Sequence, residues 1–173
     1  MHRSETMLEV PAAFCFPPFY RKQDQITFSD IVMAGTELPF FYDILFIEKP
    51  SALSSWPWEQ SPQEFNNNCS DRRSEIAEAF RKRDRKRAGK PMIQSLALFI
   101  DLAIWSSGKP VETLSPSHLM AKIKSLPYAP LNIEGRLSYI IKQPDHYLSF
   151  IQLNQLEEEL KKKLAVYFSK KKE

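Results

Sequence analysis

The contrast between scarce glycine and abundant proline constrains this chain more than any other feature. Its 173 residues contain 4 glycines and 13 prolines. Tight hairpins and phosphate-binding loops depend on glycine, because glycine adopts positive φ and lets the backbone approach a ligand closely. Proline fits the first turn of a helix and breaks a helix interior. Together the two counts predict an all-α fold of short helices that begin and end near prolines.

Apolar residues recur at helical spacing in several segments, which predicts a compact bundle of five or six short helices. The segment at about 91–107 is apolar around most of its circumference and is therefore the expected central helix. Residues 1–35 lack a clear period, but their aromatic side chains favour an irregular N-terminal arm packed on the core. Residues 36–173 are expected to form a single helical domain, with a connector at 50–62 that contains proline, serine and tryptophan.

Three local patterns predict where elements begin and end. Thr36 is a candidate N-cap for a helix that runs to Lys49, before Pro50. A charged helix is expected over 71–88, with Gly89 as its C-terminal stop. Ile26–Phe28 could extend briefly, but the sequence offers no evident partner strand, so no strand pair is predicted.

Charge, cysteine content and hydropathy indicate a cytoplasmic protein. The net charge of +3 is too small to indicate a nucleic-acid partner by itself. Cys15 and Cys69 are far apart and form no CxxC motif, as is usual for reduced thiols. The longest apolar run, residues 96–105, is about half of the roughly 20 residues that a membrane span needs. No export signal is recognisable at the N-terminus.

A search for catalytic, cofactor-binding and metal-binding motifs is negative. The chain contains no GxGxxG or P-loop pattern, no HExxH, no CxxC pair and no EF-hand loop. No catalytic residue, cofactor or metal ligand is therefore predicted, and the protein is not expected to be an enzyme. An undetected active site would need Asp101, His118, Glu134 or His146 to converge in one pocket.

The strongest local signal is a run of cations near the middle of the chain. It consists of Arg81, Lys82, Arg83, Arg85, Lys86, Arg87 and Lys90. Such a run is either a solvated helix face or a surface that neutralises the phosphates of DNA or RNA. No aromatic residue lies within the run, so the sequence does not indicate a stacking platform for single strands.

Two tryptophans on the connector form the second candidate site. Trp56 and Trp58 either fold back as a lid on the core or anchor a protein partner, because aromatic residues are enriched at interfaces. The favoured function is a non-enzymatic binding or adaptor protein with a protein partner. The alternative is a DNA- or RNA-associated protein that binds through residues 81–90.

Four stretches of the chain resemble the YpoC-like family of Bacillus-type bacteria. They are PFFYDI at 39–44, WSSGKPV at 105–111, PLNIEGRL at 130–137 and PDHYLSFIQL at 144–153. The resemblance implies a small, helical, cytoplasmic protein and implies no particular activity. It also implies a slight preference for a partner linked to nucleic acid or to cell division.

Overall fold

A computed structural model describes residues 4–61 and 69–172 of the chain, without the side chains of residues 69–71. Three N-terminal arm residues (1–3), residue 62 of the predicted connector and the Cys69 thiol therefore lie outside the described part. Within that part the chain forms seven α-helices and only one small two-stranded sheet. The prediction of a mostly helical, compact fold is confirmed.

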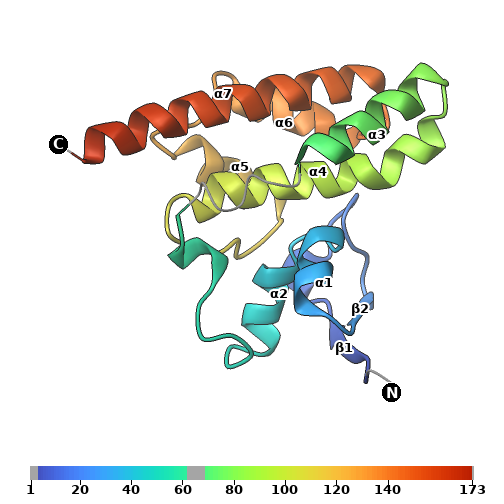
Figure 1. The fold of residues 1–173 in the computed structure, drawn as a ribbon, viewed down its shortest axis with the longest axis vertical. Helices are drawn as coiled ribbons and strands as arrows, with labels where there is room; N and C mark the ends of the chain where they lie inside the picture. Colours follow the sequence, from blue (N-terminus) through green and yellow to red (C-terminus); the bar gives the residue numbers. More distant parts are fainter. Residues whose placement is uncertain (1–3, 62–68, 173) are drawn as a thin grey trace.

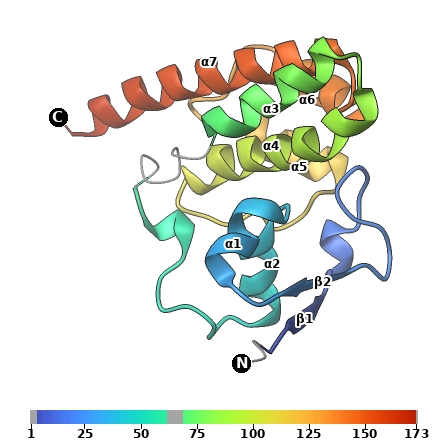
Figure 2. The same ribbon diagram turned by 45° about the vertical axis from the view of Figure 1, so that its right-hand side comes forward.

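Short helices and strands make up the first third of the chain, and longer helices the remainder. In chain order the elements are β1 (Thr6–Glu9), the 3₁₀ helix η1 (Ala12–Phe14), β2 (Gln25–Phe28), α1 (Ile31–Glu37), α2 (Phe41–Glu48), the 3₁₀ helix η2 (Pro57–Glu59), α3 (Cys69–Arg81), α4 (Arg85–Trp105), α5 (Pro116–Lys124), α6 (Ile133–Lys142) and α7 (Tyr147–Lys171). In Figures 1 and 2 the helices α3, α4, α6 and α7 run alongside one another, and the N-terminal elements cover one side of α4.

The N-terminal strands correct the expectation that no strand pair exists. β1 and β2 are antiparallel, and Leu8 lies opposite Ile26 in the register. Both of these side chains are buried in the core. The pairing has no signal in the sequence, because each strand has only four residues and no glycine turn joins the two. Burial of one face of the strand pair, with Leu8 and Ile26 in the core, fixes the register that the short sequence pattern does not specify.

Local capping explains the start and end of the first two helices. Asp30 caps α1, because its side chain accepts hydrogen bonds from the backbone N–H groups of Val32 and Met33. The expectation that Thr36 caps the next helix, α2, is wrong, since the N-cap of α2 is Phe40 in the left-handed conformation. Thr36 lies inside α1, where its hydroxyl donates to the Met33 carbonyl. The predicted end of the following helix is confirmed, since α2 has Lys49 as its C-cap.

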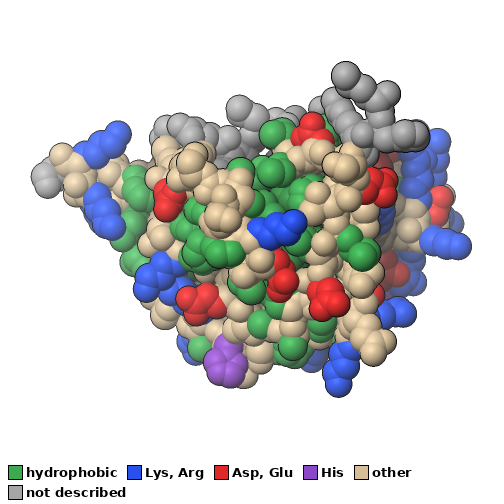
Figure 3. Space-filling model, turned by 90° about the horizontal axis from the view of Figure 1, so that it is seen from below, with side chains coloured by type: hydrophobic (Ala, Val, Ile, Leu, Met, Phe, Trp, Pro, Cys, Tyr) green, Lys and Arg blue, Asp and Glu red, His purple; other side chains and the backbone are tan. Residues whose placement is uncertain are grey.

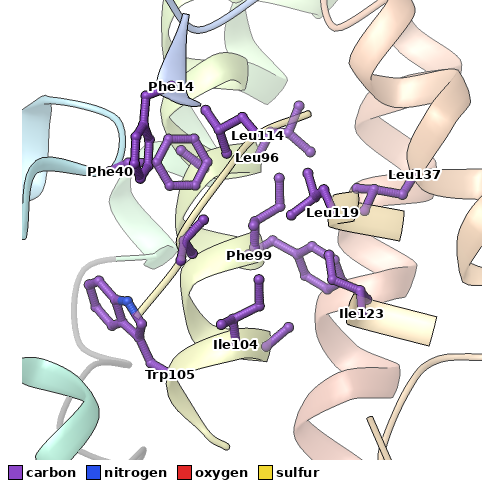
Figure 4. Close-up of a cluster of buried hydrophobic side chains, with 14 of the residues drawn as sticks. Phe14, Phe40, Leu96, Phe99, Ile104, Trp105, Leu114, Leu119, Ile123 and Leu137 are labelled. Atoms are coloured by element: carbon purple, nitrogen blue, oxygen red, sulfur yellow. The ribbon is translucent and has the colours of Figure 1, made fainter. Parts of the chain in front are cut away.

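Helix α4 lies at the centre of the hydrophobic core, as predicted for the segment near 91–107. Phe99 and Ile104 are buried between the N-terminal elements and the C-terminal helices, with Phe14 and Phe40 on one side and Ile123 on the other (Figure 4). The helix begins at Arg85, six residues before the predicted start, and it contains Pro91. None of the helices in the described ranges is long and apolar enough to cross a membrane.

Candidate nucleic-acid interface

The basic run lies at a sharp turn between two antiparallel helices. Helix α3 ends after Arg81, and Arg83 takes the left-handed conformation with φ of 56°. The Arg83 N–H donates to the carbonyl of Phe80, and the Asp84 N–H donates to that of Ala79. These two bonds form a Schellman C-terminal motif, whose left-handed position usually holds glycine.

Asp84 starts the next helix as soon as the first one ends. Its carboxylate accepts a hydrogen bond of 3.0 Å from the Arg87 N–H, which is the geometry of an N-cap. The prediction of one helix over 71–88 with Gly89 as its stop is therefore wrong. An arginine occupies the left-handed position that would have identified the turn if it were glycine, and Gly89 lies inside α4.

All seven cations of the run project into solvent at this turn, and we call them the basic tip. All seven residues are exposed. They are Arg81, Lys82, Arg83, Arg85, Lys86, Arg87 and Lys90. In the space-filling view of Figure 3, Lys and Arg side chains gather on the right, where Figure 1 places the α3–α4 turn. The two halves of the run follow different helices, so the tip is a rounded surface and not the straight charged rod that one helix would give.

Acidic neighbours neutralise only part of the basic tip. Glu78 accepts from Arg81 at 2.7 Å and lies 3.4 Å from Lys82, and the hydrogen bond from Arg81 lowers the pKa of Glu78 to about 2. Arg85 pairs with Asp145 at 3.1 Å. The other four cations form no ion pair with any residue that the structure describes. These four are Arg83, Lys86, Arg87 and Lys90.

The turn between α6 and α7 lies beside the basic tip, although it is about 60 residues further along the chain. Arg73 binds Glu157 at 2.8 Å, Phe80 contacts Phe150, and Arg85 reaches Asp145 at the α6–α7 turn. Helices α3 and α7 therefore run antiparallel. This register brings Tyr147, the first residue of α7, next to Phe80, with ring centroids 5.7 Å apart.

Tyr147 is the residue of this region that sequence reasoning missed. Its aromatic ring is outside the basic run in the sequence but beside it in space, and the residue is 59 % exposed. The Pro144–Asp145 pair marks the start of a helix, but nothing in the sequence shows which other turn that start adjoins. The cation run contains no aromatic residue along the chain, as noted from the sequence, but the fold brings the ring of Tyr147 close to it.

The two connector tryptophans lie in the core of their own chain. Trp56 is 5 % exposed and Trp58 is 7 % exposed. Their rings stack 5.4 Å apart at 8°, with Phe46 against both and Trp105 against Trp58. This arrangement is the lid on the core. Anchoring a partner would need exposed rings, and the structure leaves little of either ring accessible.

A second group of titratable residues, a pair of carboxyl groups, is buried in the core. Asp43 on α2 and Asp101 on α4 are both buried, and their carboxyl groups lie within reach of each other. Oδ2 of Asp43 and Oδ1 of Asp101 have no other hydrogen-bond partner among the described residues. One oxygen of Asp43 also accepts from the Trp105 indole N–H at 2.8 Å and from the Val111 N–H at 2.7 Å. Two carboxyl groups can form a hydrogen bond only when one carries a proton, so the pair holds one shared proton.

Burial dominates the titration of this pair. It raises the pKa of Asp43 to about 6, although the hydrogen bonds that Asp43 receives act in the opposite direction. Burial, and then the charge of Asp43, raises the pKa of Asp101 well above its ordinary value. The hydrogen bonds that Asp43 receives favour its carboxylate form, and burial beside that charge favours the neutral form of Asp101.

The carboxyl pair lies beside a very small cavity. The cavity beside Asp101 measures about 10 Å³, which is at the lower limit for a single water molecule. His118 bonds to Ser115 at the surface, Glu134 pairs with Lys124, and His146 caps α7. No hydrogen bond or ion pair between described residues joins any two of the four groups that an active site was expected to need. Nor do the described residues contain a cluster of three His, Cys, Asp or Glu side chains that could hold a metal ion.

Comparison with known proteins gives a family for the chain. The family model described as YpoC-like protein matches residues 59–172, which include the whole basic tip and Tyr147. A curated relative, "Uncharacterized protein YpoC" of Bacillus subtilis (strain 168), is 26 % identical over 156 residues, which cover 88 % of this chain and 91 % of the relative. No solved structure matches the chain. The resemblance seen in the sequence is thereby confirmed, and the chain belongs to the YpoC-like family.

Proposed function

We propose that this protein is a non-enzymatic binding protein whose basic tip binds the phosphate backbone of a nucleic acid. The observation that carries the proposal is the set of four exposed cations that no described carboxylate neutralises. Cations already paired with carboxylates give up those pairs when they bind phosphate, whereas unpaired cations gain the interaction at no such cost.

The shape of the tip supports the same conclusion. Lys86 and Lys90 lie one helical turn apart on α4, and Arg83 extends the cationic surface across the turn. Arginine and lysine at a convex turn can approach a sugar–phosphate backbone without a pocket, because backbone contacts need charge and reach more than enclosure. The net charge of +3 understates this surface, since acidic residues elsewhere in the chain offset it.

A protein partner, the other function expected from the sequence, has weaker support. The two tryptophans proposed as its anchors are buried. The exposed apolar residues that remain are distributed over several elements, including Val32 on α1 and Val166 near the end of α7. The cation cluster is thus the better supported binding surface.

The test compares two variants that lose the same charge at opposite ends of the molecule. The tip variant carries R83Q, K86Q, R87Q and K90Q. The control variant carries K161Q, K162Q, K170Q and K172Q in the second half of α7 and at its C-cap; Figure 1 shows the C-terminal end of this helix on the far side from the tip. Binding of a fluorescent 20-nucleotide DNA is measured by anisotropy at low salt, and circular dichroism checks that both variants are folded.

We expect the tip variant to bind at least about 30-fold more weakly than the wild type, and the control variant to bind within about 3-fold of it. Loss of affinity that is equal in the two variants would show that only total charge matters and would overturn the proposal. Competition with polyglutamate separates the two kinds of partner. If polyglutamate displaced the DNA at equal charge concentration, the tip would be a site for acidic proteins and not for nucleic acid.

A further inference from the structure

Tyr147 is an exposed aromatic residue next to the basic tip, and two aromatic rings of the protein contact its ring. The Phe80 ring lies against it at 5.7 Å and 70°, and the Phe150 ring at 6.2 Å and 41°. Even so, the residue is 59 % exposed. Two aromatic contacts on the protein side fix the ring, and the rest of it faces solvent.

The position of Tyr147 relative to the cations follows from the helix register. Phe80 precedes the cation run by one residue and contacts Tyr147 directly. Asp145, two residues before Tyr147, lies between α6 and α7 and forms an ion pair with Arg85, the first residue of α4. The exposed ring therefore packs against the last turn of α3, and Asp145 ties the segment just before the ring to the first turn of α4; these two turns carry the cations.

An aromatic ring beside a cationic surface favours a particular form of nucleic acid. In a duplex each base is stacked between its neighbours, so the face of a base is not available to a side chain. In a single strand the faces are free, and stacking of a base on an aromatic side chain is worth about 1–3 kcal/mol. Cations alone would bind both forms through phosphate and would distinguish them poorly.

We infer that the basic tip binds single-stranded nucleic acid, with phosphates on its cations and one base stacked on the Tyr147 ring. This inference rests on the proposed function, since it names the class of nucleic acid that the same surface takes. It uses an interaction that the sequence did not indicate, because the ring and the cations meet only in the folded chain.

The test uses three substitutions at Tyr147 and two DNA probes. Tyr147→Ala removes the ring, Tyr147→Leu keeps apolar bulk against Phe80 without a ring, and Tyr147→Phe keeps the ring without the hydroxyl. The probes are a single-stranded 20-mer that contains 2-aminopurine and the corresponding duplex. Leu131→Ala serves as a matched control, since Leu131 is also an exposed apolar residue, at 69 %.

We expect the alanine and leucine variants to bind the single strand about 10-fold more weakly, and the phenylalanine and Leu131 variants to bind like the wild type. Binding of the duplex should change less than 2-fold in all four variants. Quenching of 2-aminopurine fluorescence, which reports stacking, should be present with the wild type and lost with the leucine variant.

Other outcomes separate the two levels of the proposal. If the leucine variant bound like the wild type, or if the duplex bound as tightly as the single strand, the stacking inference would be overturned. The proposed function would still stand in that case if the tip variant lost affinity for DNA. If the wild type bound neither probe at low salt, both would fail together.

Discussion

Two groups of charged residues in this protein face opposite environments. The basic tip carries seven exposed cations, of which four have no carboxylate partner among the described residues. The Asp43–Asp101 pair lies in the core and holds its charge through hydrogen bonds from Trp105 and Val111. Water solvates the cations of the basic tip, whereas hydrogen bonds from the folded chain take the place of water around the buried carboxyl pair.

The difference teaches where each group acts. Exposed charges contribute little to folding because water and salt screen them, so their arrangement is free to serve binding. Buried charges contribute strongly to folding because an unsatisfied partner in the core is costly, and a cavity of about 10 Å³ leaves no room for a substrate. We therefore expect substitutions at the tip to change binding without loss of stability, and substitutions in the pair to change stability.

The largest effect on folding is expected from removal of the central acceptor. Asp43→Ala removes the acceptor to which the buried Trp105 indole N–H and Val111 N–H donate, and we expect a loss of about 3–5 kcal/mol in the free energy of unfolding. Asp43→Asn retains an acceptor oxygen and should lose less than half as much. Urea denaturation of the two variants measures the difference. Equal losses would mean that these hydrogen bonds do not stabilise the core.

A smaller, pH-dependent effect is expected at the other carboxyl group. Because the pKa of Asp101 is raised in the folded state, the folded chain binds a proton that the unfolded chain releases, and stability falls as the pH rises from about 4 through the folded-state pKa. In Asp101→Asn the side-chain amide N–H can donate to Asp43 at any pH, so the variant needs no titrating proton for this hydrogen bond. We expect it to be about 1–2 kcal/mol more stable than the wild type at pH 8 and to lose this advantage near pH 4.

Denaturation of both proteins from pH 4 to pH 8 measures this dependence. Titration of the carboxyl groups outside the pair is common to the wild type and the variant and cancels in the difference between them, so the difference reports the pair as a whole. A difference that stayed constant over this range would contradict a shared proton in the pair.

The smallest effect is expected at Arg83, whose side chain is proposed to favour DNA binding while its backbone conformation lowers the stability of the fold. Its left-handed φ of 56° costs an arginine more than a glycine, so Arg83→Gly should raise the free energy of unfolding by about 0.5–1 kcal/mol. The same change removes one unpaired cation and should weaken DNA binding about 3-fold. Thermal unfolding and anisotropy test both sides. If Arg83→Gly bound DNA more tightly than the wild type, Arg83 would not be one of the cations that contact phosphate.

The predictable part of the fold is the part that local chemistry determines. Asp145 and His146 follow a proline that ends one helix and precedes α7, and Lys49 ends α2, as proline and capping rules indicate. The β1–β2 pair and the turn at Arg83 were not predictable in this way. Short strands carry too little pattern, and an arginine in a glycine position gives no turn signal.

The candidate site was predictable only in its charges. Residues 81–90 were recognisable as a cation cluster, but the helix turn within them and the neighbouring Tyr147 depend on contacts between distant parts of the chain. The same is true of the carboxyl pair, since Asp43 and Asp101 lie 58 positions apart in the sequence. The burial of Trp56 and Trp58 was one of two open alternatives, because composition alone does not say which side of a connector faces the core.

The salt dependence of DNA binding tests the central claim most directly, namely that four unpaired cations of the tip contact phosphates. For a single strand, four such contacts give a slope of log affinity against log salt concentration of about −3. We predict this slope for the wild type and for the α7 control variant, and a slope near zero for the tip variant. The same slope in the wild type and the tip variant would contradict the account.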